Sequence, residues 1–210
     1  MEAELEKLGL NIQQNLVVEN GNWRWRNGSE ELFSVRQIRK DIENAKLEGA
    51  ANDLVYVWNS WAPSKANFLL WRALLGRIAS REGLARRGVL LSEIGCPRCG
   101  LELEIPDHIF IKCLWARSIW WNVLAWVRIR FPVDCETILD FINYVKDCPG
   151  GRIWKRVVNT IVIATVWRIW NARNAKVFEN CFIPMSKSAE AIKEDAFLWI
   201  RNRSRNFNPK

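Results

Sequence analysis

The chain has 210 residues, of which 49% are hydrophobic, so it can bury the core of one domain plus an appendage, and wholesale disorder is excluded. Its net charge of +8 falls on residues 150–210, which hold 12 Lys and Arg against 4 Asp and Glu. Such a basic segment either meets nucleic acid or another polyanion, or forms an ordinary solvated helical surface.

Apolar runs and cysteine usage predict an intracellular protein, nuclear or cytoplasmic, that is neither secreted nor embedded in a membrane. Residues 1–7 are acidic and lack the apolar stretch of a signal peptide. The most apolar run, residues 157–167, is too short to span a bilayer. Outside the motif described below, Cys135, Cys148 and Cys181 form no paired framework, so we expect inert thiols in a reducing compartment.

The N-terminal part of the chain carries one hairpin signal. Residues 1–20 are polar and weakly patterned, which is typical of a loose lead-in. Residues 23–26 alternate apolar and polar side chains, and Asn27-Gly28 marks a tight turn. Residues 32–35 then form the returning strand of a short β-hairpin. Ser34 can then cap a helix over roughly residues 35–46.

Two further helices are predicted before the cysteine-rich region. The first follows Pro63 with Ser64 as its cap, and the second follows Ser80 and stops at Gly88, which suits a left-handed C-terminal residue. Four arginines gather around the second helix, and we expect them either to contact phosphates or to form a solvated face. They are Arg77, Arg81, Arg86 and Arg87.

The strongest chemical signal is a set of three cysteines and the only histidine of the chain. The spacing is Cys96-x2-Cys99-x8-His108-x4-Cys113. Three thiols and one imidazole supply the four ligands of a closed tetrahedral zinc site, and two cysteines three residues apart can bind from one turn. A closed site is structural rather than catalytic because it leaves no position for water. The alternative is a set of buried free cysteines.

A single helix over residues 107–127 is expected to follow, with His108 and Cys113 in its first turns. Its inward face is predicted from apolar spacing, which selects Phe110, Leu114, Trp121 and Leu124. Pro132 breaks the pattern, and residues 135–145 predict a short helix. The chain has thirteen tryptophans, and helical spacing assigns four of them to the core. These four are Trp58, Trp71, Trp121 and Trp167.

The C-terminal part predicts two long helices after the linker at residues 149–151. The pattern over residues 152–179 is apolar almost all round, which indicates a centrally buried helix. Residues 186–203 form an amphipathic pattern, and residues 201–210 form a basic tail.

Together these motifs resemble the reverse-transcriptase zinc-binding domain of plant LINE-type, non-LTR retrotransposons. Order, spacing and residue type agree over about residues 33–121, and the Trp23-x-Trp25 hairpin matches the start of the domain. Residues 167–178 resemble a helix that often follows it. The residues that carry the resemblance are Trp61, Pro63, Ser64, Lys65, Phe68, Trp71, Arg72, residues 84–88, the cluster Cys96, Cys99, His108 and Cys113, and Trp120.

The resemblance implies an accessory module that binds Zn2+ through the four cluster residues. In the family, such a module is thought to assist the reverse transcriptase by binding RNA or DNA. The chain lacks an Asp-Asp pair, so the polymerase motif is absent, and we expect a detached piece of a polyprotein that is not an enzyme. A structural or protein-interaction module, with the reverse transcriptase domain as a partner, is the alternative.

The expected fold is mainly α, with a short N-terminal β-hairpin and a Cys-Cys-His-Cys zinc knuckle. We divide the chain into a lead-in over residues 1–22, the zinc-binding domain over residues 23–131, and a helical extension with a basic tail over residues 132–210.

Overall fold

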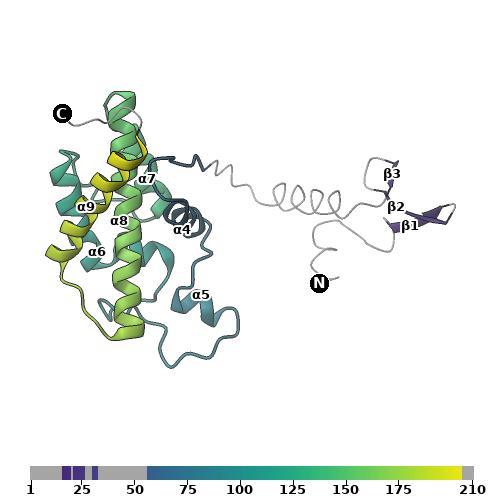
Figure 1. Ribbon diagram of the computed structural model, residues 1–210. Coiled ribbons are helices and arrows are strands. Elements are labelled where there is room, and N and C mark those ends of the chain that lie inside the picture. The colour runs from purple at the N-terminus through teal and green to yellow at the C-terminus, as the bar shows by residue number, and fades with distance from the viewer. Residues whose placement is uncertain (1–15, 20, 27–29, 33–55, 205–210) are drawn as a thin grey trace. The chain divides into compact units, whose positions relative to one another are not determined.

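A computed structural model describes residues 16–19, 21–26, 30–32 and 56–204, and the chain divides into two units. One unit lies within residues 1–55 and the other spans Tyr56–Lys210 (Figure 1). The predicted mainly helical class, with β-structure near the N-terminus, is confirmed in the described part of the chain. None of the described helices combines the length and apolarity needed to cross a membrane.

The first unit holds an antiparallel sheet of three short strands in the order β1-β2-β3. They are β1 (Leu16–Glu19), β2 (Asn22–Arg26) and β3 (Glu30–Leu32). Arg24 pairs with Leu32, so the predicted hairpin is confirmed, although its return strand begins earlier, at Glu30. The helix predicted over residues 35–46 lies outside the described residues.

Strand β1 corrects the expectation of a loose lead-in over residues 1–20. Leu16 pairs with Trp25, and Gly21, in the left-handed region at φ 76°, lies in the turn between the strands. Asn20-Gly21 repeats the dipeptide of the next turn, so the missed signal was present in the sequence.

Helices make up the regular structure described in the second unit. They are α4 (Ser64–Leu74), α5 (Arg81–Ala85), the π-helical turn η1 (His108–Lys112), α6 (Leu114–Trp126), α7 (Ile138–Asp147), α8 (Arg152–Glu179) and α9 (Met185–Arg203). Figure 1 shows α8 running through the middle of the unit with α9 beside it. Helix α8 packs against α4, η1, α6, α7 and α9.

Helix α8 is the centre of the core, as its pattern, apolar almost all round, predicted. Every residue from Thr160 to Val166 is buried. The two threonines in this run donate their hydroxyls to the carbonyls of Arg156 and Ile161, so no buried hydroxyl is left unpaired there. Our division of the chain at residues 22 and 131 stays a prediction, and α8 packs against helices on both sides of residue 131.

The short helices before the knuckle largely follow their predicted signals. Ser80 caps α5, because its hydroxyl accepts a hydrogen bond from the Gly83 amide, and Gly88 takes a left-handed φ of 83°. Ser64 differs from the prediction: α4 begins at this residue, Pro63 occupies the cap position, and no side-chain capping bond forms.

The single helix expected over residues 107–127 is wrong. The chain forms the π-turn η1, leaves helical geometry at Cys113 with φ −56° and ψ 127°, and restarts as α6. The extended Cys113 sets a new rotational phase for α6. Asp107 makes no capping bond to η1, and its carboxylate instead accepts from the Ile138 amide at the start of α7.

The new phase of α6 overturns two predicted core positions. Trp121 is 61% exposed and Leu114 is 63% exposed, whereas the neighbouring Trp120 is buried and donates its indole N–H to the Phe110 carbonyl at 2.6 Å. Trp58, also assigned to the core, is 50% exposed. The remaining assignments fit better: Phe110 and Leu124 are buried, Trp167 packs against the core, and Trp71 is half-buried.

Candidate metal centre

Four ligand atoms from separate parts of the chain meet at one point. The sulfurs of Cys96, Cys99 and Cys113 and an imidazole nitrogen of His108 all lie within 4.8 Å of one another. Cys96 Sγ is 4.0 Å from Cys113 Sγ, and Cys99 Sγ is 3.2 Å from His108 Nε2. Tetrahedral Zn2+ at usual bond lengths separates its ligand atoms by about 3.5–3.8 Å. The group is therefore close enough to hold a metal ion.

The first pair of ligands sits in a tight hairpin. The Cys96 amide donates to the Glu102 carbonyl at 2.8 Å, and Gly95 bridges Leu103 across the hairpin. Gly100 takes a left-handed φ of 70° and donates its amide to the Cys96 carbonyl, which closes the turn. The Cys96 sulfur accepts from the backbone amides inside this turn, an arrangement that suits a metal-bound thiolate.

The second pair flanks the π-turn η1. His108 opens η1 and Cys113 ends it, and the Cys113 amide donates to the His108 carbonyl at 2.8 Å. The Cys96 thiol hydrogen-bonds Cys113 and lowers the pKa of that thiol, an effect that burial opposes and the amides of Ala116 and Trp115 reinforce. The hydrogen bond with Cys113, together with burial, raises the pKa of the Cys96 thiol.

Glu102 orients the histidine, and sequence reasoning missed it. Its carboxylate lies 3.0 Å from His108 Nδ1, while Nε2 of the same ring faces Cys99. A carboxylate on the far nitrogen of a metal-ligating histidine fixes the tautomer and raises ligand basicity. The glutamate lies inside the ligand interval, so the motif itself contained the signal.

Arg98, between the first two cysteines, connects the knuckle to the loop between α8 and α9. Its guanidinium stacks between the rings of Trp115 and Phe182, at 3.7 and 4.0 Å from their centroids, and donates to the Ile183 carbonyl at 2.9 Å. Burial lowers the pKa of Arg98, and the nearby thiols Cys113 and Cys96 oppose this effect. A cation held here balances the negative charge of a three-thiolate site.

Glu104 makes a second connection from the knuckle into the core. It is fully buried and accepts from Arg173 of α8 through both oxygens, at 2.8 Å from Nε and 2.5 Å from Nη2. The Arg81 amide at the start of α5 also donates to it at 2.7 Å. This carboxylate therefore joins the knuckle, α5 and α8.

The four arginines predicted to contact nucleic acid differ in their surroundings. Arg81 is half-buried and donates to the Gly95 carbonyl at 2.9 Å, and Arg86 pairs with Glu82 at 2.6 Å. Arg77 and Arg87 are exposed. Their role in binding stays a prediction.

The other three cysteines lie outside the four-ligand group, and all six are free of disulfides. Cys135 and Cys148 are half-buried, burial raises the pKa of both thiols, and Cys181 is exposed.

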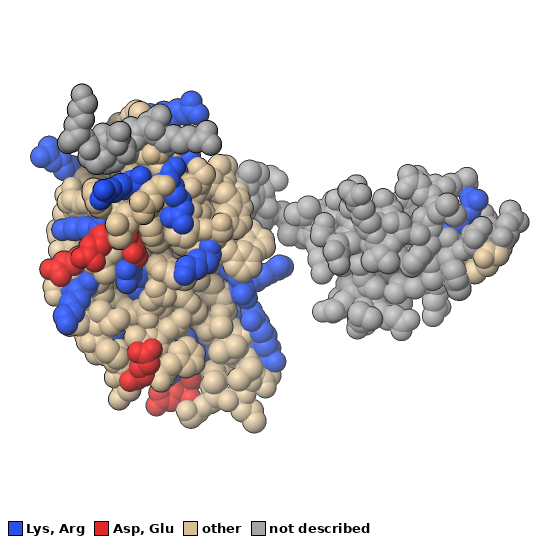
Figure 2. All heavy atoms as spheres, viewed as in Figure 1, with Lys and Arg blue, Asp and Glu red and all other residues tan. Residues whose placement is uncertain are grey.

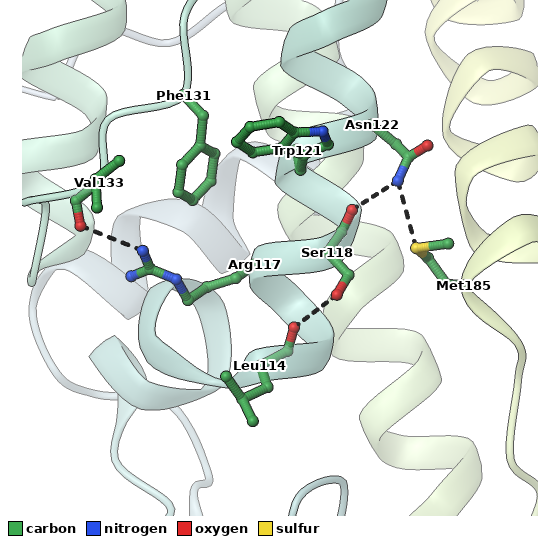
Figure 3. Close-up of a pocket in the computed structure, with 8 residues that line it drawn as sticks. All are labelled: Leu114, Arg117, Ser118, Trp121, Asn122, Phe131, Val133 and Met185. Atoms are coloured by element: carbon green, nitrogen blue, oxygen red, sulfur yellow. Dashed lines mark hydrogen bonds between the residues drawn. The ribbon is translucent and has the colours of Figure 1, made fainter.

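An apolar groove of about 620 Å³ lies at the misassigned face of α6 (Figure 3). The Trp121 ring faces Phe131 at a centroid distance of 5.7 Å, and Arg117 reaches over the same Phe131 to donate to the Val133 carbonyl. Met185, from the start of α9, lines the opposite wall. The exposed tryptophan is thus part of a surface concavity.

Comparison with known families gives one match. The family described as zinc-binding in reverse transcriptase matches residues 33–120, a segment that contains all four ligand positions. No curated protein and no solved structure shows significant similarity to the chain. Residues 33–120 are therefore similar to the zinc-binding domain of this family.

Proposed function

We propose that this chain is a zinc-stabilised accessory module of a non-LTR retrotransposon reverse transcriptase of the plant LINE type, because residues 33–120 match the family described as zinc-binding in reverse transcriptase. The convergence of Cys96, Cys99, His108 and Cys113 within that domain is the observation that carries the proposal. The sequence of the flanking coding region tests the origin: an upstream polymerase frame is expected.

The donor set favours Zn2+ as the ion. Three sulfurs and one imidazole nitrogen suit zinc, and four protein ligands leave no site for a catalytic water. When bound, the ion supplies a structural crosslink. The residues around it position the ligands: Glu102 orients His108, and Arg98 places a positive charge beside the sulfurs.

Binding to RNA or DNA is the proposed activity of the module. Its support is the basic excess of residues 150–210 and the arginines beside the knuckle. Binding by such groups proceeds largely through counterion release, so affinity should fall steeply as salt rises. Fluorescence anisotropy of labelled RNA and DNA across a salt series tests this, and no binding at low salt contradicts it.

We propose that the chain has no polymerase activity of its own. The basis is the absence of an Asp-Asp pair from the sequence, because two-metal nucleotidyl transfer needs carboxylate ligands. A primer-extension assay with Mg2+ tests it, and template-dependent synthesis contradicts it.

The alternative is a protein-interaction module that docks on the reverse transcriptase domain. The groove around Trp121 and Phe131 favours this reading, because an exposed tryptophan in an apolar concavity is typical of binding hot spots. Trp121→Ser should abolish association with the polymerase domain and leave salt-dependent RNA binding unchanged.

A further inference from the structure

Two packed segments of the second unit contain no acidic residue. Neither residues 56–77, which include α4, nor residues 152–178 of α8 hold an Asp or Glu. Helix α4 packs directly on α8, so the two segments that meet along this contact, the α4–α8 seam, contribute Lys and Arg but no acidic side chain. The Lys and Arg of these segments are Lys65, Arg72, Arg77, Arg152, Lys155, Arg156, Arg168, Arg173 and Lys176. Arg168 and Arg173 pair with acidic residues from elsewhere, Asp195 and Glu104.

The two segments contact each other at more than one point. The Asn59 side chain donates to Asn159 and Thr160 near the start of α8, and Lys65 lies over the ring of Trp167, further along α8. Arg72 comes seven positions after Lys65, so both occupy one face of α4, about 10 Å apart along its axis. The opposite face of α4 is buried.

Each of three cations along the seam lies against an aromatic ring. Arg156 lies over Trp61 at 4.4 Å, Lys65 over Trp167 at 5.2 Å, and Arg72 over Phe68 at 5.8 Å. These rings hold the cations at the surface with little freedom, which lowers the entropy cost of a further contact.

Two aromatic side chains at the seam remain open to solvent. Phe68 is 46% exposed and Trp58 is 50% exposed, and Trp58 is braced edge-on by Tyr56 at 5.8 Å. Proteins that bind single-stranded nucleic acid combine a positive track for the backbone with aromatic platforms for the bases. A merely solvated helix face would normally mix both signs of charge and carry fewer exposed rings.

We infer that single-stranded nucleic acid binds along the α4–α8 seam, with phosphates at Arg156, Lys65 and Arg72 and bases stacked on Phe68 and Trp58. This inference rests on the proposed nucleic-acid binding and places it away from α5, where Glu82 neutralises Arg86. Arg72 and Arg156 donate only to neutral oxygens, those of the Arg77 carbonyl and the Ser60 hydroxyl, so their charge is not neutralised by a carboxylate there. In Figure 2 the Asp and Glu side chains of this unit lie at its left and lower parts, and Lys and Arg side chains lie at the top, on the right and also beside the acidic groups on the left.

The test compares two variants that remove the same charge. The seam variant replaces Arg156, Lys65 and Arg72 with Gln, and the control replaces the exposed Arg130, Lys146 and Lys187 with Gln. The probe is fluorescein-labelled oligouridine, followed by anisotropy across a salt series. The seam variant should lower the slope of log affinity against log salt by about 2 units, since each contact with a single strand contributes about 0.7. The control variant should change this slope by less than about 0.7, the contribution of one phosphate contact.

A separate variant tests whether bases stack on Phe68. Phe68→Leu preserves the charge and should weaken oligouridine binding about fivefold or more, while an abasic strand of equal length binds both proteins alike. Circular dichroism and zinc content check that each variant folds. If the seam and control variants lose affinity for oligouridine and salt slope equally, the seam is not the binding site, although the chain still binds nucleic acid. Absence of binding by the parent chain at low salt overturns both.

Discussion

The carboxylate of Glu104 and the guanidinium of Arg173 form a bidentate ion pair in the protein interior, 69 residues apart in sequence. The glutamate follows the first two cysteines of the metal centre, and the arginine belongs to the central helix α8. The pair therefore attaches the metal-binding hairpin to a helix that lies beyond the matched domain segment.

Breaking this pair should strongly destabilise the second unit. Arg173→Met leaves a buried carboxylate without its partner, which costs about 3–5 kcal/mol in the free energy of unfolding. Urea denaturation measures the loss. Arg168→Met, which removes the more exposed pair with Asp195, is the control and should cost about 1 kcal/mol or less. Equal losses for the two variants would contradict the structural role of Glu104.

Removing the metal should unfold the knuckle before the helical core. Structural zinc contributes about 10–16 kcal/mol in small sites, and whole domains are stable by only about 5–15 kcal/mol. After chelation, amide hydrogen exchange should accelerate over residues 94–115 while residues 158–172 of α8 stay protected. Uniform protection before and after chelation would show that the hairpin does not depend on the ion.

Glu102→Gln should weaken metal binding without removing a ligand. Loss of the carboxylate behind His108 typically lowers metal affinity about 10- to 100-fold. Competition with a chromophoric chelator measures the change. Glu93→Gln is the matched control, because this exposed side chain pairs only distantly with Arg81, at 3.5 Å. An unchanged affinity in Glu102→Gln would mean that another group orients the histidine.

Truncation of the two adjacent tryptophans of α6 should destabilise the protein by very different amounts. Trp120→Ala empties a fully buried site and should cost about 3–5 kcal/mol. Trp121→Ala removes a side chain that is 61% exposed and should cost less than about 1 kcal/mol. Thermal or urea unfolding compares them, and a larger loss for Trp121 would restore the original assignment of that residue to the core.

Features set by local spacing could be predicted from the sequence. The cysteines and histidine converge because their spacing is that of one hairpin and one turn, and the middle of α8 is buried because its pattern is apolar on almost all sides. The orientation of α6 could not be predicted the same way. Periodicity assumed an unbroken helix, and the extended backbone at Cys113 reset the phase that decides between Trp120 and Trp121.

Contacts between segments that are distant in the sequence could not be predicted either. Nothing in the sequence around Glu104 indicates that it pairs with a residue of α8. Likewise, nothing around Arg98 indicates that it stacks on Phe182, which comes 84 positions later in the chain. From the sequence alone, both residues look like ordinary charged residues of a loop. Their roles depend on how α8 and the loop after it pack against the knuckle, which only the tertiary structure supplies.

The most direct test of the account is the zinc content of the purified chain. Native mass spectrometry or elemental analysis should find one zinc per chain, and Cys96→Ser should lose it, while Cys181→Ser, which alters an exposed thiol outside the ligand group, should retain it. A parent protein that holds almost no zinc after expression in zinc-supplemented medium, or a Cys96→Ser variant that binds it as well as the parent, would contradict the metal centre.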